Sequence, residues 1–274
     1  MLPITAIVVG LNEGHLLRES LPAISFCDEL IYVDLGSDDD SVAIAEAHGA
    51  RIFHHPRVPS GEYVLASAQT WARNDWILFV DPDEKLDERL QVELTTRFPD
   101  LAQEPNLGAI AAPWQFYFKN QPLFGTAWGG RRPRLFLANR KRFLFTPETH
   151  RGRTLRTGFY SLNLGGGGQI DHYWSNSWSQ LISKHWRYLK TEGGSRYRRG
   201  DRITLGGLLV ALARLVRKTY GRFWDRRDGF QGFLLSLLWI TYNSLALMSL
   251  WVYPLTSSKK QDDLANLGLE AKEK

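Results

Sequence analysis

Cysteine is almost absent from this chain of 274 residues, and a single cysteine excludes any intramolecular disulfide. Because Cys27 stands beside Phe26, we expect it to be a small core residue. A single cysteine also indicates a reducing, cytosolic setting. The first residues lack the basic region of a secretory signal, and their apolar run stops at Gly10, so we expect a strand there. The bulk of the protein is therefore expected to stay inside the cell.

Two glycine-rich motifs that hold phosphates are also missing. No GxGxxG follows the first apolar run, and GxxxxGK[ST] occurs nowhere in the sequence. Neither a dinucleotide-binding fold nor a P-loop is indicated, so any phosphate has to be held in another way.

Positive charge is concentrated in one segment. The net charge is +5, but residues 196–227 hold ten Arg or Lys against Asp201 and Asp225, a net +8. The rest of the chain is therefore slightly acidic, and the basicity serves a local purpose.

Apolar runs alternate with segments of helical spacing over the first 80 residues. The expected strands are 4–9, 29–33, 51–54 and 76–80, and helices are expected at 12–24, from 42 onward and at 63–72. This pattern predicts an α/β fold with a mostly parallel, right-handed sheet flanked by helices. We expect three regions: a catalytic domain at 1–195, helices at 196–256 and a polar tail at 257–274.

An acidic turn follows the most apolar of these strands. Asp81, Asp83 and Glu84 come directly after residues 76–80, where ligands bind in open α/β sheets. Pro82 fixes its own φ, so that Asp81 and Asp83 can converge on one point. Such a pair suits Mg²⁺ or Mn²⁺, completed by phosphate oxygens. The alternative is a polar turn that starts the next helix.

A second polar turn follows the strand at 29–33. Asp34, Ser37 and Asp38 are placed to receive a base and a ribose, at the sheet edge that faces the Asp81 turn if the strands are neighbours. An ordinary loop that caps the following helix is an equally good interpretation.

Three segments, in this order and spacing, resemble family 2 glycosyltransferases of the GT-A fold: Ile-Val-Val-Gly-Leu-Asn-Glu (7–13), Val-Asp-Leu-Gly-Ser-Asp-Asp (33–39) and Val-Asp-Pro-Asp-Glu (80–84). The resemblance implies that Asp34 and its loop hold the nucleotide, and that Asp83 ligates a metal bridging the diphosphate, with Asp81 close by. The residues that would line the same pocket are Leu11, Asn12 and Glu13. Leu11 and Pro82 depart from the residues common in the family.

Within that family the chain is similar to the branch that adds sugars to lipopolysaccharide core, including core β-1,4-glucosyltransferases. The segments that support this are 132–136, 170–173 and 227–233. The resemblance implies a nucleotide-sugar donor, most simply a UDP-sugar, and a glycan or glycolipid acceptor of the cell envelope. A polyprenyl-phosphate glycosyltransferase would share the nucleotide site, and a catalytically silent membrane-bound scaffold would share the fold.

Inversion by direct displacement requires a general base on the far side of the anomeric carbon. Glu148 and His150 are the candidates, in the segment where relatives commonly show Val-His-Glu. We favour Glu148 because carboxylates are the usual base in this family. Alternatively, Glu148 only pairs with Arg151 or Arg153.

Glycines and aromatic residues give weaker indications. Gly165–Gly168 is expected to be a flexible loop near the acceptor, and Trp128 is a candidate for stacking on a sugar. His172 and Trp174 either contact the diphosphate or acceptor or form a packed aromatic pair, the interpretation we favour. Trp71, Trp76 and Trp114 are expected in the core.

The C-terminal third is expected to bind the cytoplasmic face of the inner membrane. Residues 229–254 carry no charge and are long enough to span it. Polar residues recur through this run, and the preceding 205–216 stretch is a basic amphipathic helix suited to an anionic membrane surface. We therefore favour a peripheral or monotopic helix pair over a span. Two buried helices are the alternative, and the uncharged run argues against nucleic acid as a partner.

Overall fold

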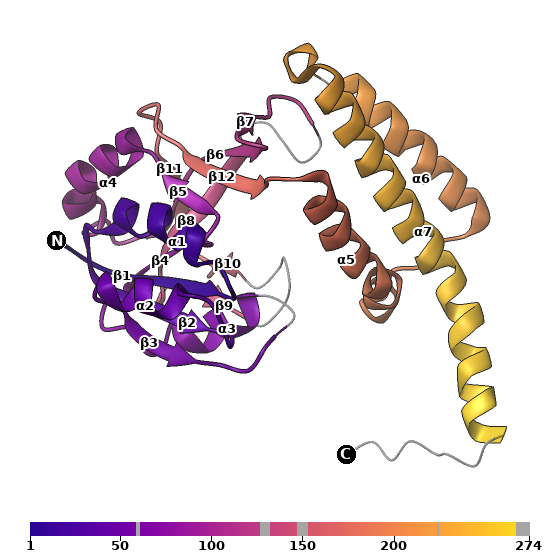
Figure 1. Ribbon diagram of the computed structural model, residues 1–274, viewed down its shortest axis with the longest axis horizontal. Coiled ribbons are helices and arrows are strands. Elements are labelled where there is room, and N and C mark those ends of the chain that lie inside the picture. Colours follow the sequence, from indigo (N-terminus) through magenta and orange to yellow (C-terminus); the bar gives the residue numbers. More distant parts are fainter. Residues whose placement is uncertain (59–60, 127–131, 147–152, 224, 267–274) are drawn as a thin grey trace. The chain divides into compact units, whose positions relative to one another are not determined.

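The computed structural model describes residues 1–58, 61–126, 132–146, 153–223 and 225–266 (Figure 1). The chain divides into two compact units. The sheet unit comprises Met1–Tyr117 and Arg131–Trp174, and the helical unit comprises Phe118–Gly130 and Ser175–Lys274.

The first part of the sheet unit alternates strands and helices, as the sequence predicts. The elements are β1 (Leu2–Gly10), α1 (Gly14–Ser20), the 3-10 turn η1 (Pro22–Ile24), β2 (Cys27–Asp34), α2 (Ser41–Ala47), β3 (Arg51–His54), α3 (Gly61–Ala68) and β4 (Trp76–Phe79). The four strands are parallel and lie in the order β3-β2-β1-β4. The predicted α/β sheet is confirmed.

Beyond β4 the sheet is mixed. Its remaining elements are β5 (Glu84–Leu86), α4 (Glu88–Leu101), β6 (Leu107–Phe118), β7 (Gln121–Pro122), β8 (Arg132–Asn139), β11 (Tyr160–Asn163) and β12 (Ile170–Ser175), with β9 (Phe143–Phe145) and β10 (Arg153–Leu155) as a separate pair. The long path of the sheet is β3-β2-β1-β4-β8-β6-β12-β5. Because β8 is antiparallel to both β4 and β6, β6 runs in the same direction as β4.

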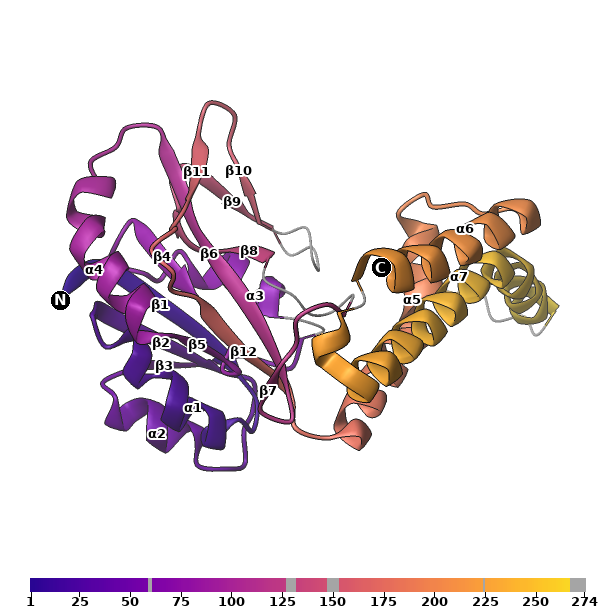
Figure 2. The same cartoon turned by 90° about the horizontal axis from the view of Figure 1, so that it is seen from above.

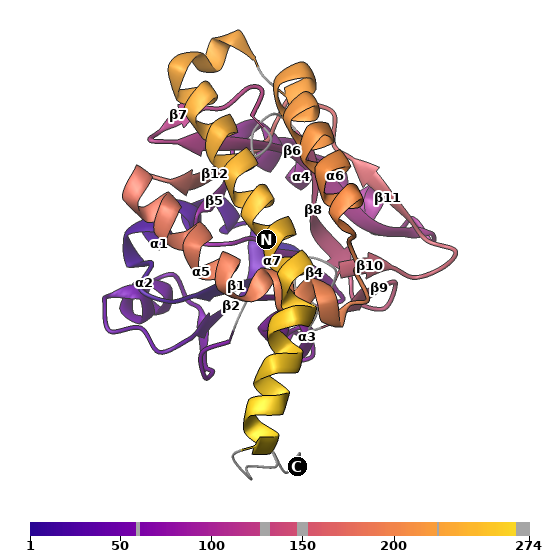
Figure 3. The same cartoon turned by 90° about the vertical axis from the view of Figure 1, so that its right-hand side faces the viewer.

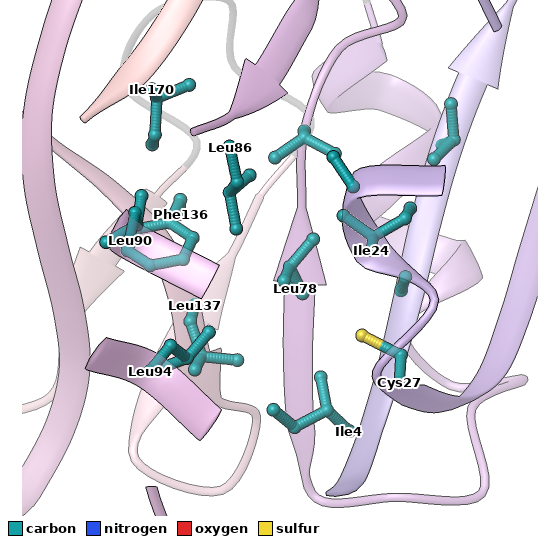
Figure 4. Close-up of a cluster of buried hydrophobic side chains, with 14 of the residues drawn as sticks. Ile4, Ile24, Cys27, Leu78, Leu86, Leu90, Leu94, Phe136, Leu137 and Ile170 are labelled. Atoms are coloured by element: carbon teal, nitrogen blue, oxygen red, sulfur yellow. The ribbon is translucent and has the colours of Figure 1, made fainter. Parts of the chain in front are cut away.

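The core lies on both faces of this sheet. Alternate residues of β4 point to opposite sides: Trp76 and Leu78 pack with α1, α2 and α4, whereas Ile77 and Phe79 pack with α3. Figure 2 shows α3 on the opposite side of the sheet from α1 and α2. Cys27 is buried in the first cluster, beside Ile4 and Ile24 (Figure 4), so its predicted core position is confirmed.

Glu29 joins three segments near the amino ends of the strands. Its buried carboxylate accepts hydrogen bonds from Thr5 Oγ1 at 2.6 Å, from the backbone N–H of Arg73 at 2.7 Å and from the Arg51 guanidinium. Burial alone would raise the pKa of Glu29, but these hydrogen bonds lower it below its ordinary value. The network ties β1 and β2 to the turn that leads into β4.

The helical unit contains α5 (Trp178–Arg198), α6 (Leu205–Lys218), the π turn η2 (Thr219–Phe223), the 3-10 turn η3 (Arg226–Asp228) and α7 (Gly229–Asn266). The Ser177 and Thr204 side chains cap α5 and α6 by accepting backbone N–H groups. Both helices pack along α7, which extends past them (Figures 1 and 3). α5 crosses α7 so closely that a Cβ on Gly193 would lie 2.7 Å from the Ser249 backbone.

α7 carries the most apolar stretch of the chain. Residues Arg226–Pro254 are long and apolar enough to cross a membrane, with a mean hydropathy of 1.6. Only 22% of the most apolar part of this segment is buried inside the structure. Phe230 is 74% exposed and Leu209 of α6 is 61% exposed. A helix in the core of a soluble protein would bury far more of these side chains.

Candidate functional site

The strand register brings three loops to one edge of the sheet. Gly10 at the end of β1 pairs with Asp34 at the end of β2, and Ile7 pairs with Phe79 at the end of β4. The two acidic turns are therefore not direct neighbours, because β1 lies between them at about 5 Å from each flanking strand. The loop after β1 lies between the two polar turns.

The loops after β1 and β2 are fastened to each other by side chains. The backbone N–H of Asn12 donates to Ser37 Oγ at 3.0 Å, and the Asn12 Oδ1 accepts the N–H of Asp38 at 2.8 Å. Asn12 adopts φ 57°, a left-handed conformation that Asn tolerates better than most residues. The structure brings these predicted residues together. Leu11 and Glu13 flank Asn12, and the N–H of Glu13 donates to Ser41 Oγ at 3.0 Å.

Asp34 organises the turn that follows its own strand. Its carboxylate accepts the N–H groups of Ser37 at 2.9 Å and Gly36 at 3.2 Å, and it lies 3.1 Å from His54 Nδ1. Burial alone would raise the pKa of Asp34, but the hydrogen bonds from Ser37, His54 and Gly36 lower it, so the carboxylate is ionised at neutral pH. The Asp34 side chain is 4% exposed, so only a small part of it is accessible to a ligand.

An arginine whose side chain is only 10% exposed binds two of the three carboxylates after β4. Arg134 of β8 donates from Nη2 to Glu84 Oε2 at 2.6 Å and to Asp81 Oδ2 at 3.2 Å. Glu84 is buried and also accepts the N–H of Asp81 at 2.9 Å, so its side chain stabilises the turn of residues 81–84. The Asp81 side chain is 58% exposed and is the outward-facing member of this group.

Asp83 is paired differently. Its Oδ2 lies 3.2 Å from His172 Nε2, and its backbone carbonyl accepts the N–H of Tyr173 at 2.8 Å, so β12 holds Asp83 twice. The His172 ring stacks on Trp114 with centroids 4.7 Å apart and planes 7° apart. The Arg134 guanidinium also lies 4.7 Å from the Trp114 ring centroid. Trp114 therefore supports the partners of all three carboxylates.

Burial perturbs the ionisation of this cluster. Desolvation raises the pKa of Glu84 to about 7, against the opposing attraction of Arg134. Burial by itself would lower the pKa of Arg134, but Glu84 and Asp81 raise it, so the guanidinium stays charged. Within the described part of the chain, Glu84 Oε1 and Trp114 Nε1 are buried without a hydrogen-bond partner.

The side chains near the end of β4 could provide only a few protein ligands to a single cation. Among the residues that the structure describes, no group of three or more His, Cys, Asp or Glu side chains is arranged to hold a metal ion. Asp83 and His172 nevertheless meet, and a carboxylate with an imidazole suits Mn²⁺ better than Mg²⁺. Asp81 would have to turn from Arg134 to join them.

Several predicted residues lie outside the described residues. These are Glu148, His150 and Trp128. The glycine run is described, and the prediction of a flexible loop is wrong for part of it: the Gly166 N–H donates to Glu93 Oε2 at 2.9 Å, and a Cβ on Gly168 would lie 2.4 Å from the Leu90 backbone. This loop is packed on α4.

Arg134 is a candidate site residue that the sequence alone does not reveal. It lies within the segment 132–136, and nothing in the residues near it shows that β8 lies beside β4. Trp114 is half-buried and packs against the core as predicted, but its role as a platform depends on the same pairing of distant strands.

The family model for glycosyl transferase family 2 matches residues 5–163, which include all three loops at this edge. The chain belongs to glycosyl transferase family 2. Among relatives of this family-2 chain is an uncharacterized glycosyltransferase of Rickettsia felis, 36% identical over 37% of this chain and 36% of its own length. The match therefore spans about a third of that relative. An uncharacterized glycosyltransferase of Rickettsia prowazekii is 26% identical over 91% of this chain and 87% of its own length.

Two further similarities concern the branch and the fold. The lipopolysaccharide core biosynthesis glycosyltransferase LpsC of Rhizobium meliloti is 29% identical over 33% of this chain and 35% of its own length. Among solved structures, the mannosyltransferase PcManGT of Pyrobaculum calidifontis, in complex with GDP-Man and Mn²⁺, superposes with a TM-score of 0.51 at 14% identity, over 90% of this chain and 85% of that one. The predicted GT-A fold of this family-2 chain is confirmed.

Proposed function

We propose that this family-2 chain is an inverting, metal-dependent glycosyltransferase that moves a sugar from a nucleotide-diphosphate donor, a UDP-sugar, to an envelope glycan or lipid-linked acceptor such as lipopolysaccharide core. The observation that carries the proposal is the convergence of the Asp34 turn, the Asn12 loop and the Asp83–His172 pair on one sheet edge. The similarity to LpsC supports the acceptor class.

The donor would bind across the loops after β1 and β2. Because Asp34 already accepts two backbone N–H groups and contacts His54, its main role would be to shape the turn. Ser37 and Asp38 would then contact the base and ribose, while Leu11, Asn12 and Glu13 line the pocket. A turn that is pre-formed in this way loses little conformational freedom when the nucleotide binds.

Asp83 and His172 would hold the cation, with Asp81 as a further ligand or as a partner of the donor. When bound, Mg²⁺ or Mn²⁺ supplies charge that stabilises the leaving diphosphate. The chain's own contribution is orientation: β12 fixes Asp83 through the Tyr173 N–H, and Trp114 fixes the His172 ring. Arg134 would keep Glu84 in place, whereas Asp81 would turn from Arg134 to reach the cation.

The acceptor hydroxyl must lose its proton as it attacks the anomeric carbon. Glu148 would accept that proton, and His150 is the alternative base. A polyprenyl-phosphate acceptor remains the runner-up, because it would use the same donor site, and a silent scaffold of the same fold would bind nucleotide without turnover.

The helical unit would dock on the cytoplasmic face of the inner membrane, as a peripheral or monotopic anchor. Exposed apolar side chains of α6 and α7 would enter the lipid: Leu205, Leu209, Phe230, Phe233 and Leu237. Arg214, Arg217 and Lys218 lie between these two groups in the sequence and suit an anionic headgroup layer.

The test is a panel of nucleotide sugars, assayed for metal-dependent hydrolysis by the purified chain without an acceptor. We expect one UDP-sugar to be hydrolysed with Mn²⁺ or Mg²⁺. Asp83→Ala should abolish this hydrolysis and metal-dependent nucleotide binding, whereas Asp100→Ala, which removes an exposed carboxylate from α4, should change neither. Full activity of Asp83→Ala would refute the site, and nucleotide binding without any turnover would favour the silent scaffold.

A further inference from the structure

His54 is an exposed histidine with one ring nitrogen held by a buried carboxylate. It ends β3, where it pairs in register with Asp34 at the end of β2. Its Nδ1 lies 3.1 Å from Asp34 Oδ2, and its side chain is 73% exposed, whereas that of Asp34 is almost fully buried. The imidazole therefore lies at the surface of the turn that the donor is proposed to cover.

The partner of Nδ1 determines which ring nitrogen carries the proton. Burial would raise the pKa of Asp34, but the hydrogen bonds that it accepts lower it, so the carboxylate is ionised at neutral pH and can only accept. Nδ1 must therefore donate, and in the neutral ring Nε2 then keeps a lone pair. The structure thus presents an oriented hydrogen-bond acceptor at the exposed end of β3.

Three side chains of the adjoining loops already use their oxygens within the protein. Asp34 accepts the N–H groups of Gly36 and Ser37. Ser37 Oγ accepts the N–H of Asn12, and Asn12 Oδ1 accepts the N–H of Asp38. The part of the chain that the structure describes provides no hydrogen-bond partner for Nε2 of the imidazole. This nitrogen is therefore available to a ligand.

The order of the strands indicates which part of the donor would meet His54. The strands lie in the order β3-β2-β1-β4, and Asp83, the proposed cation ligand, follows the end of β4. β3 is three strand spacings from β4, about 14 Å. A nucleotide that keeps its diphosphate at the cation and crosses the loop after β1 therefore places its base over the ends of β2 and β3.

An acceptor at this position discriminates between bases. Proteins recognise a single base through hydrogen bonds to its Watson–Crick edge. Uracil carries a hydrogen on N3 and donates there, whereas N3 of cytosine is itself an acceptor and would oppose the lone pair of Nε2.

We propose that His54 determines the base specificity of the donor site: Nε2 accepts the N3–H of uracil and disfavours cytosine. This role rests on the proposed function and deepens it, because it assigns the uridine preference to one residue. Asp34 would act through His54, by fixing which nitrogen of the imidazole accepts.

The experiment compares His54→Asn with His55→Asn in the full chain. Asparagine places its NH₂ group near the position of Nδ1, so His54→Asn can still donate to Asp34 but lacks Nε2. His55 is the matched control: its Nδ1 lies 2.7 Å from the carbonyl oxygen of Pro56, and the same replacement one residue further on leaves His54 in place. Calorimetric titration with UDP, CDP and GDP, each with Mn²⁺ and at about pH 8.5 to keep imidazole neutral, measures the affinities.

The ratio of the UDP and CDP affinities is the decisive quantity. We expect the wild-type chain to bind UDP roughly tenfold more tightly than CDP, the usual effect of one hydrogen bond gained against an acceptor left unpaired. In His54→Asn the two affinities should come within about twofold of each other, mainly because UDP binds less tightly, and His55→Asn should keep the wild-type ratio. Amide hydrogen exchange at Gly36 and Ser37 should stay as in the wild type, which would show that the turn is intact.

Three results would overturn the role. If His54→Asn keeps the wild-type ratio, His54 at most supports the turn. If the ratio falls together with faster exchange at Gly36 and Ser37, the turn and not Nε2 sets the preference. If the wild-type chain binds CDP or GDP more tightly than UDP, the recognised base is not uracil. Each result refutes this role alone, whereas a wild-type chain that binds none of the three nucleotides refutes the proposed function as well.

Discussion

At the scale of single residues, Arg134 determines which of the three carboxylates after β4 are paired with a guanidinium. Two of them, Asp81 and Glu84, share its guanidinium, whereas Asp83 pairs with His172. We therefore expect the proposed cation to bind Asp83 first, because a cation at Asp81 has to compete with the positive charge of Arg134.

The base gives a prediction at the same scale. We expect Glu148→Gln to leave donor binding unchanged and to lower the turnover number by roughly two to four orders of magnitude, since the acceptor hydroxyl loses its proton acceptor. Calorimetric titration with UDP and steady-state transfer assays measure the two quantities. Should His150→Ala show this loss while Glu148→Gln does not, His150 is the base.

Glu29 gives a prediction on stability and pH. The Glu29→Gln variant puts an NH₂ group against buried donors, and we expect a loss of about 2 kcal/mol in the free energy of unfolding at pH 7. Because the pKa of Glu29 is lowered in the folded state from 4.5, the stabilisation is present above pH 4.5 and is lost as the pH falls through the lowered value. Urea unfolding of both proteins between pH 7 and pH 3 measures this, and a constant difference over that range would contradict it.

The residues that could be predicted are those next to a strong local pattern. Asp34, Asp81 and Asp83 each follow an apolar strand, and parallel alternation alone places them at one edge. Arg134 and Trp114 could not be assigned, because their roles depend on β8 inserting antiparallel between β4 and β6. No feature of residues 132–139 encodes that neighbourhood.

At the scale of elements, the contact between the glycine loop and α4 gives a matched pair of variants. A Cβ at Gly168 would meet the Leu90 backbone at 2.4 Å, whereas a Cβ at Gly165 would meet nothing within 4 Å. We expect Gly168→Ala to lower the free energy of unfolding by about 2 kcal/mol and Gly165→Ala to change it by less than about 0.5 kcal/mol. Chemical denaturation measures both, and equal effects would disprove the close packing.

The packing of the glycine loop on α4 could not be predicted from the sequence. Four consecutive glycines are typical of a flexible segment, and the pattern carries no sign of a helix close by. Here Gly166 and Gly168 are small because α4 approaches them, as the bond from Gly166 to Glu93 indicates. The strands and helices of residues 2–79 were predicted better, since their periodicity is local.

At the scale of the whole molecule, attachment to lipid separates the alternatives for α6 and α7. We expect the chain to bind anionic vesicles and to be released by high salt or carbonate, because basic side chains and exposed apolar side chains occur together on these helices. Replacing Leu209 and Phe230 with Glu should weaken vesicle binding at least about tenfold, while Glu46→Gln on α2 serves as a control. Retention until detergent is added would support a span.

The hold of β12 on Asp83 restricts how this chain can change in length. Side chains alternate along β12, so His172 meets Asp83 only while His172 pairs with Glu84 and Asp171 pairs with Lys85. Insertion of one residue within Ile170–His172 would place another side chain opposite Asp83 and would shift the Tyr173 N–H that donates to the Asp83 carbonyl. Natural variation in this chain should therefore place insertions and deletions in its surface loops, and keep the count of residues within β12 fixed.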